Sequence, residues 1–130
     1  MESGRVVGIG GVFFKSKEHT QLGSWYSHQL GIDYKSWGAI FRWRSFEHPE
    51  TEHATAWNIF PADSTHFGPA TAPFMINYIV DDLDALLEKM KNNGVRIDPK
   101  REDSDYGRFA WIFDPDGNKI ELWEPPKASS

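Results

Sequence analysis

The alternation of apolar and polar positions along the first half of the chain predicts a strand, a helix and three further strands. Residues 5–14 are mainly valine, isoleucine and phenylalanine with interspersed glycines, which is typical of a β-strand. Residues 18–30 carry an apolar stripe at helical spacing and are followed by a glycine, which favours the left-handed conformation that ends a helix. Further strands are expected at 32–37, 39–46 and 53–60.

The same succession starts again after residues 61–73, which are rich in turn-forming residues and which we interpret as a linker. An apolar strand over residues 74–80 precedes a helix that Asp81 or Asp82 is expected to cap. A short strand near 95–98 and a polar loop over 99–107 follow. The chain then forms a hairpin of two strands, 109–114 and 119–124, joined by the strong turn sequence Asp-Pro-Asp-Gly-Asn.

This repetition indicates an internal duplication and an α+β fold. Gly31 and Gly94 are 63 residues apart, and so are Asn58 and Glu121, which hold matching places in the last strand of each half. Two tandem βαβββ modules are predicted, because each helix covers one face of its own sheet and the other faces must then meet across a cleft. The expected organisation is a single domain, residues 5–125, with halves 5–60 and 74–125, the linker 61–73 and a disordered tail, 126–130.

Composition narrows the classes of function. The net charge of −5 disfavours nucleic-acid binding, and the absence of cysteine excludes disulfides, thiolate nucleophiles and Cys-ligated metals. The sequence shows neither a signal peptide nor an apolar run that could span a membrane, so a cytoplasmic location without membrane contact is expected. Aromatic residues make up 15% of the chain. They serve either an ordinary small core or an aromatic-lined pocket for a small molecule.

Three segments carry a resemblance to a known family: residues 25–31 (WYSHQLG), 80–95 (VDDLDALLEKMKNNGV) and 113–125 (FDPDGNKIELWEP). Their order and spacing resemble the vicinal oxygen chelate superfamily, which includes glyoxalase I, bleomycin- and fosfomycin-resistance proteins and extradiol dioxygenases. The resemblance spans roughly residues 5–125. It implies a glyoxalase-like cleft and, since the family often pairs, a homodimer whose cleft lies within one chain or across a swapped pair.

In the metalloenzymes of that family, four cleft positions bind a divalent ion, and by motif these positions fall on Gly11, Asn58, Met75 and Glu121. Glycine has no side chain, a thioether is a poor ligand for Zn, Mn, Ni or Mg, and Asn58 offers only a neutral oxygen. A catalytic divalent ion normally takes about three protein ligands. We therefore expect no metal cofactor, and neither glyoxalase I nor fosfomycin-resistance chemistry, which need the ion as a Lewis acid.

The remaining site residues follow from strand alternation. Glu121 is the candidate catalytic residue, because a poorly solvated carboxylate can act as a general acid or base or can accept hydrogen bonds from a ligand. Ile9 and Ala56 are also expected to face the cleft. The predicted ligand-binding residues are Gly11, Phe13, Asn58, Phe60, Met75, Asn77 and Trp123.

Several alternatives stay open at this point. One is a divalent-metal-dependent lyase or dioxygenase with relocated ligands, for instance Glu121 with His53. A non-catalytic scaffold would fill its cleft with its own aromatic side chains. Alternation cannot decide whether Arg42 and Arg44 or their aromatic neighbours face the cleft, although we favour solvated arginines. The other histidines, including His66 in the linker, are interpreted as surface or turn residues, and the loop 99–107 is either a lid or plain surface.

Overall fold

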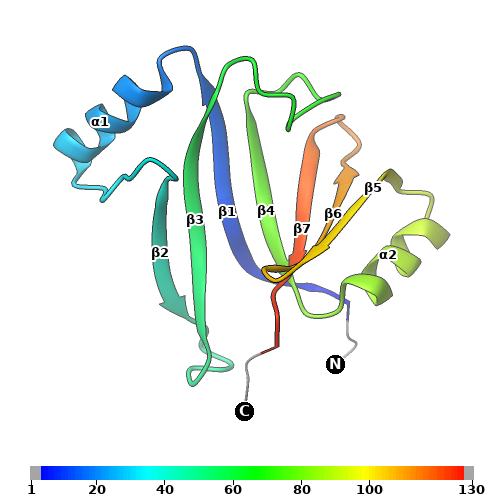
Figure 1. The fold of residues 1–130 in the computed structure, drawn as a ribbon. Helices are drawn as coiled ribbons and strands as arrows, with labels where there is room; N and C mark the ends of the chain where they lie inside the picture. Colours follow the sequence, from blue (N-terminus) through cyan, green and yellow to red (C-terminus); the bar gives the residue numbers. More distant parts are fainter. Residues whose placement is uncertain (1–3, 128–130) are drawn as a thin grey trace.

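The computed structural model describes residues 4–127 and arranges them as one seven-stranded sheet with two helices (Figure 1). The elements are β1 (Val6–Ser16), α1 (His19–Leu30), β2 (Ala39–Arg44), β3 (Glu52–Pro61), β4 (Phe74–Val80), α2 (Leu83–Asn92), β5 (Arg96–Ser104), β6 (Gly107–Phe113) and β7 (Lys119–Glu124). Residues 128–130 of the predicted tail lie outside the described part. Neither of the described helices is both long and apolar enough to cross a bilayer.

The two halves of the chain join edge to edge through their first strands. The strand order is β2-β3-β1-β4-β7-β6-β5, with β1 and β4 antiparallel at the centre. In each half the first strand pairs in parallel with the last, which places Phe13 opposite Asn58 and Asn77 opposite Glu121. The duplication predicted from the sequence is thus seen in the pairing, and the order of elements fits the predicted α+β arrangement.

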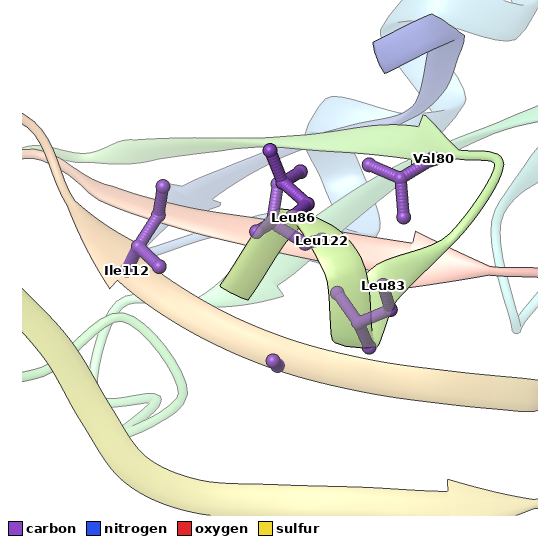
Figure 2. Packing of buried hydrophobic residues seen from close by; sticks show 6 residues of the cluster. Val80, Leu83, Leu86, Ile112 and Leu122 are labelled. Carbon is purple, nitrogen blue, oxygen red and sulfur yellow. The ribbon is translucent and has the colours of Figure 1, made fainter. Parts of the chain in front are cut away.

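The second helix forms where the sequence predicts it and covers one face of the strands of the second half. Asp82 caps α2 by accepting a hydrogen bond from the backbone N–H of Ala85 at 3.1 Å. The apolar stripe of the helix then packs on alternate residues of the strands beneath it (Figure 2). The buried members of this cluster are Val80, Leu83, Leu86, Ala110, Ile112 and Leu122. The opposite face of the sheet carries Met75, Asn77, Trp111 and Glu121, and we call it the inner face.

The predicted strand at 32–37 is wrong. This segment contains a single isolated bridge between Lys35 and Gly38 and no ladder. Tyr34 instead anchors this segment by packing. Its ring lies directly over Gly23 of α1, and its hydroxyl donates to Asn58 Oδ1 at 3.5 Å. The first half therefore has three strands in the sheet and the second half has four.

The predicted polar loop over 99–107 is also wrong for most of its length, and with it the idea that this loop is a lid. β5 continues to Ser104 and pairs with β6 up to Gly107, leaving only a tight turn between them. A shift in register between Ile97 and Arg101 accommodates Pro99, which cannot donate to the ladder. Charged residues are common on edge strands such as β5, so a polar composition does not exclude a strand.

Candidate ligand site on the inner face of the sheet

The inner face centres on the buried carboxylate of Glu121. Side chains alternate along β7, so Leu122 packs into the α2 cluster while Glu121 points to the inner face, where it is 6% exposed. Asn77 Nδ2 donates to its Oε2 at 2.7 Å, and Trp111 Nε1 donates to its Oε1 at 3.2 Å. Both donors lie directly opposite Glu121 in the neighbouring ladders. The carboxylate is therefore fixed between its two cross-strand neighbours.

His66 completes the surroundings of this carboxylate, and sequence reasoning missed it. Its Nε2 lies 3.4 Å from Glu121 Oε1, and its ring stacks on Phe60 with centroids 5.5 Å apart and planes inclined by 7°. The side chain is 30% exposed, so it connects the buried carboxylate to solvent. A carboxylate next to an imidazole is an arrangement that can hold or transfer a proton. The one sequence signal was an aromatic residue, Phe67, beside this histidine in a polar segment.

Lys119 holds the segment that carries His66. Its Nζ donates to the backbone carbonyls of His66 at 3.0 Å and Gly68 at 2.9 Å. The side chain lies on the inner face two residues before Glu121 and is 9% exposed. Burial lowers the pKa of the Lys119 ammonium, and the nearby charge of Lys100 lowers it further. Residues 61–73 are thus anchored across the inner face.

The cleft expected between the two halves is occupied by side chains of the protein itself. Phe67, Met75 and Trp111 form a cluster in which each residue is 1% exposed. The partly buried rings that pack against it are those of Phe13, Phe60 and Phe109. Two surface hollows lie elsewhere: one of about 480 Å³ beside Trp25 on α1, and one of about 550 Å³ beside Met90 at the end of α2.

The structure places most of the predicted ligand-binding residues around this cluster. Phe13, Phe60 and Met75 belong to it, and Asn77 binds Glu121. The ring of Phe13 folds back over Gly11, with its tip 2.6 Å from where a Cβ on that glycine would lie. Asn58 and Trp123 lie beside the cluster. Asn58 accepts from the hydroxyl of Tyr34, while Trp123 stacks on Phe109 with centroids 6.0 Å apart.

Ile9, in contrast, does not share this face. Irregularities in β1 shift its register against β4 on both sides of Ile9, which pairs with Tyr78. Tyr78 packs against the α2 cluster, so Ile9 lies on the helix side and is 45% exposed. Simple alternation fails here because each bulge adds a residue to one strand and reverses the parity beyond it.

The register of β2 and β3 settles which side of these strands faces inward. Arg42 is opposite Ala54 and Trp43 is opposite His53, so the arginine shares the face of Asn58, and His53 points to the helix side. Arg42 is exposed and pairs with Glu52. His53 stacks on Trp43 with centroids 4.6 Å apart. His53 therefore cannot act with Glu121, and that pair of relocated metal ligands is wrong.

The donor atoms present do not fit a catalytic divalent ion. Of the four positions implied by the family resemblance, Gly11 contributes no atom and Met75 is packed into the aromatic cluster. Glu121 has two buried donors and His66 as neighbours, and Asn58 offers an amide oxygen. Across residues 4–127, the His, Asp and Glu side chains nowhere gather in a group of three that could hold a metal.

One buried polar atom on the inner face lacks a partner. Asn77 Oδ1 accepts no hydrogen bond within the described structure, although its amide nitrogen is bound to Glu121. The oxygen lies against Gly10, next to Ile79 and Trp123. A buried acceptor of this kind favours a ligand or water that donates to it.

Comparison with known proteins agrees with this architecture. The sequence model of the Glyoxalase/Bleomycin resistance protein/Dioxygenase superfamily matches residues 23–122. No curated protein matches the chain significantly.

Solved structures with a similar fold include two methylmalonyl-CoA epimerases. The enzyme from Mycobacterium tuberculosis has a TM-score of 0.65 and 18% identity over 98% of this chain and 93% of that one. A variant of the Streptomyces coelicolor enzyme in complex with 2-nitronate-propionyl-CoA has a TM-score of 0.69 and 13% identity over 97% and 99%. An NAD-dependent benzaldehyde dehydrogenase from Legionella pneumophila has a TM-score of 0.58 and 14% identity over 89% and 98%. At these identities the likeness shows the fold alone.

Proposed function

The chain belongs to the glyoxalase/bleomycin resistance protein/dioxygenase superfamily, and we propose that it binds a small molecule on the inner face of its sheet without a divalent metal. The observation that carries the proposal is the arrangement around Glu121. Its carboxylate is bound by Asn77 and Trp111, contacted by His66 and surrounded by aromatic rings. A mostly apolar site with few, well-placed polar groups is the usual form of a small-molecule site.

The aromatic cluster favours a ligand with a flat apolar body. Phe13, Phe60 and Phe109 are only partly buried, so their rings line the accessible edge of the cluster. Flat ligands stack on such rings or meet them edge to face, which adds to the free energy of burying apolar surface. The fold accommodates organic ligands elsewhere, as the Streptomyces coelicolor epimerase complex shows for that protein.

Entry of a ligand requires movement of residues 61–73. This segment inserts Phe67 into the cluster and places His66 beside Glu121, so it covers the site in the structure described here. It has no regular secondary structure between Pro61 and Phe74. Irregular segments open at lower free-energy cost than strands do, which makes this one the natural cover for the site.

A scaffold role is the second candidate, and the closed inner face favours it. Phe67, Met75 and Trp111 are almost fully buried and fill the inner face. This is expected of a protein that has no open ligand cleft and acts instead through contacts with other proteins. The two functions differ in one respect. A binding protein must expose this cluster to admit its ligand, whereas a scaffold keeps it closed.

A ligand screen by thermal unfolding tests the proposal. A flat aromatic ligand at 100 times its dissociation constant should stabilise the wild-type protein by about 2.7 kcal/mol. The Glu121→Gln variant, which keeps the size of the side chain but removes its charge, should gain clearly less from the same ligand. Unchanged melting temperatures of both proteins across a panel of aromatic acids, amines and neutral amides would favour the scaffold instead.

A further inference from the structure

Three lysine ammonium groups lie over aromatic rings of the buried cluster on the inner face. They come from three different strands: Lys15 from β1, Lys100 from β5 and Lys119 from β7. The Nζ of Lys15 lies 5.1 Å from the centroid of the Phe67 ring. Those of Lys100 and Lys119 lie 5.2 Å and 5.8 Å from the Trp111 ring. Since Phe67 and Trp111 belong to one buried cluster, all three cations lie against side chains of that cluster, and Lys100 is near enough to Lys119 to lower its pKa.

None of these three lysines forms an ion pair within residues 4–127. Asp98 and Glu121 are the acidic groups near enough to act on Lys119, yet its pKa is still lowered overall by burial. Glu121 is itself contacted by His66. In a chain whose net charge is −5, this is a local excess of positive charge rather than general basicity.

Lys119 also retains unused hydrogen-bonding capacity. An ammonium group has three N–H donors, and two of them are directed to the carbonyls of His66 and Gly68. A buried cation that forms no ion pair is costly, and an anion supplied from outside would offset that cost. The aromatic rings beneath the lysines would contact the apolar body attached to such an anion.

We propose that the ligand carries an anionic group, a carboxylate or a phosphate, and that Lys15, Lys100 and Lys119 bind it beside the Phe67 and Trp111 rings. This inference rests on the proposed binding function and specifies its ligand class. The apolar part of the ligand lies against the aromatic cluster, and its charged part lies at the end of the inner face held by Lys119.

Matched probes separate this inference from the function on which it rests. Calorimetric titration would compare 1-naphthoate with 1-naphthamide, which has almost the same shape but no charge, and with 1-naphthyl phosphate. Either anion should bind about 10- to 100-fold more tightly than the amide, as expected for a hydrogen bond to a charged group. The tighter of the two anions identifies which anionic group the lysines prefer.

Two lysine-to-glutamine variants, each of which removes one positive charge, test where the anion binds. Lys100→Gln should weaken binding of the preferred anion about threefold or more and leave the amide unchanged. Lys89→Gln, on the exposed side of α2, should leave both unchanged. Equal affinity for anion and amide, or equal effects of the two variants, would overturn the inference while the binding function stands. If none of the three probes binds, both the inference and the binding function fail.

Discussion

Replacing Phe67 with alanine should lower the free energy of unfolding by about 3–5 kcal/mol, the cost of removing a large aromatic side chain from a packed core. The size of this effect follows from burial. Phe67 is 1% exposed and packs against Phe60 at a centroid distance of 5.3 Å as well as against Met75 and Trp111. Urea denaturation of the variant and the wild type measures the difference.

Phe46→Ala is the matched control, because Phe46 is fully exposed in the turn region after β2. Its loss should change stability by no more than about 0.5 kcal/mol. If Phe67→Ala cost as little as this control, residues 61–73 would not pack against the inner face, and the site would be open in solution. The cavity left by a true core deletion should also admit a small aromatic molecule such as toluene, which should stabilise the variant more than the wild type.

The second large effect is expected at Glu121. Replacing it with leucine leaves the buried donors of Asn77 and Trp111 without an acceptor and should cost about 3–5 kcal/mol. Glu121→Gln should cost less, about 1–2 kcal/mol, because its amide oxygen can still accept one of these hydrogen bonds. Chemical denaturation of both variants measures the two costs.

Glu88→Leu, on the exposed side of α2, is the control for the two Glu121 variants and should hardly change the free energy of unfolding. A double-mutant cycle between Glu121 and Asn77 should give a coupling free energy of about 1–3 kcal/mol, since the two side chains are in direct contact. Coupling near zero would mean that the carboxylate is not held as described, and the proposed polar centre of the site would be lost.

Much of the fold could be predicted because it depends on local signals. The glycine after α1, the Asp82 cap and the apolar stripe of α2 each act over a few residues, and the structure contains all three. The spacing that links Asn58 to Glu121 also predicted correctly that the two residues hold matching places, each in parallel register with the first strand of its half.

The features that the sequence did not predict depend on long-range packing. Residues 61–73 look like a linker because turn-forming residues dominate their composition. They are anchored by Phe67, which packs into the buried cluster, and by Lys119, which follows Gly68 by 51 residues and donates to its carbonyl. The start of β5 matches the strand predicted near 95–98, but the sequence predicts a loop for its continuation to Ser104 because an edge strand needs no apolar alternation. Ile9 was misplaced because bulges are not visible in a single sequence.

The family's metal positions could be located only by resemblance, since no pattern within this chain points to Gly11 or Met75. What the structure adds is His66, which reaches Glu121 from a segment that no motif covers. We therefore propose that Glu121 and its neighbours bind an organic molecule and not a metal ion.

Native mass spectrometry of the protein purified from its own host tests this claim most directly. We predict that the wild-type protein carries an additional mass equal to that of a small organic molecule, and that this mass is lost or much reduced in Glu121→Gln. A stoichiometric mass increase equal to one Mn, Ni or Zn ion, lost in the same variant, would contradict the account and restore a metal centre built on Glu121 and His66.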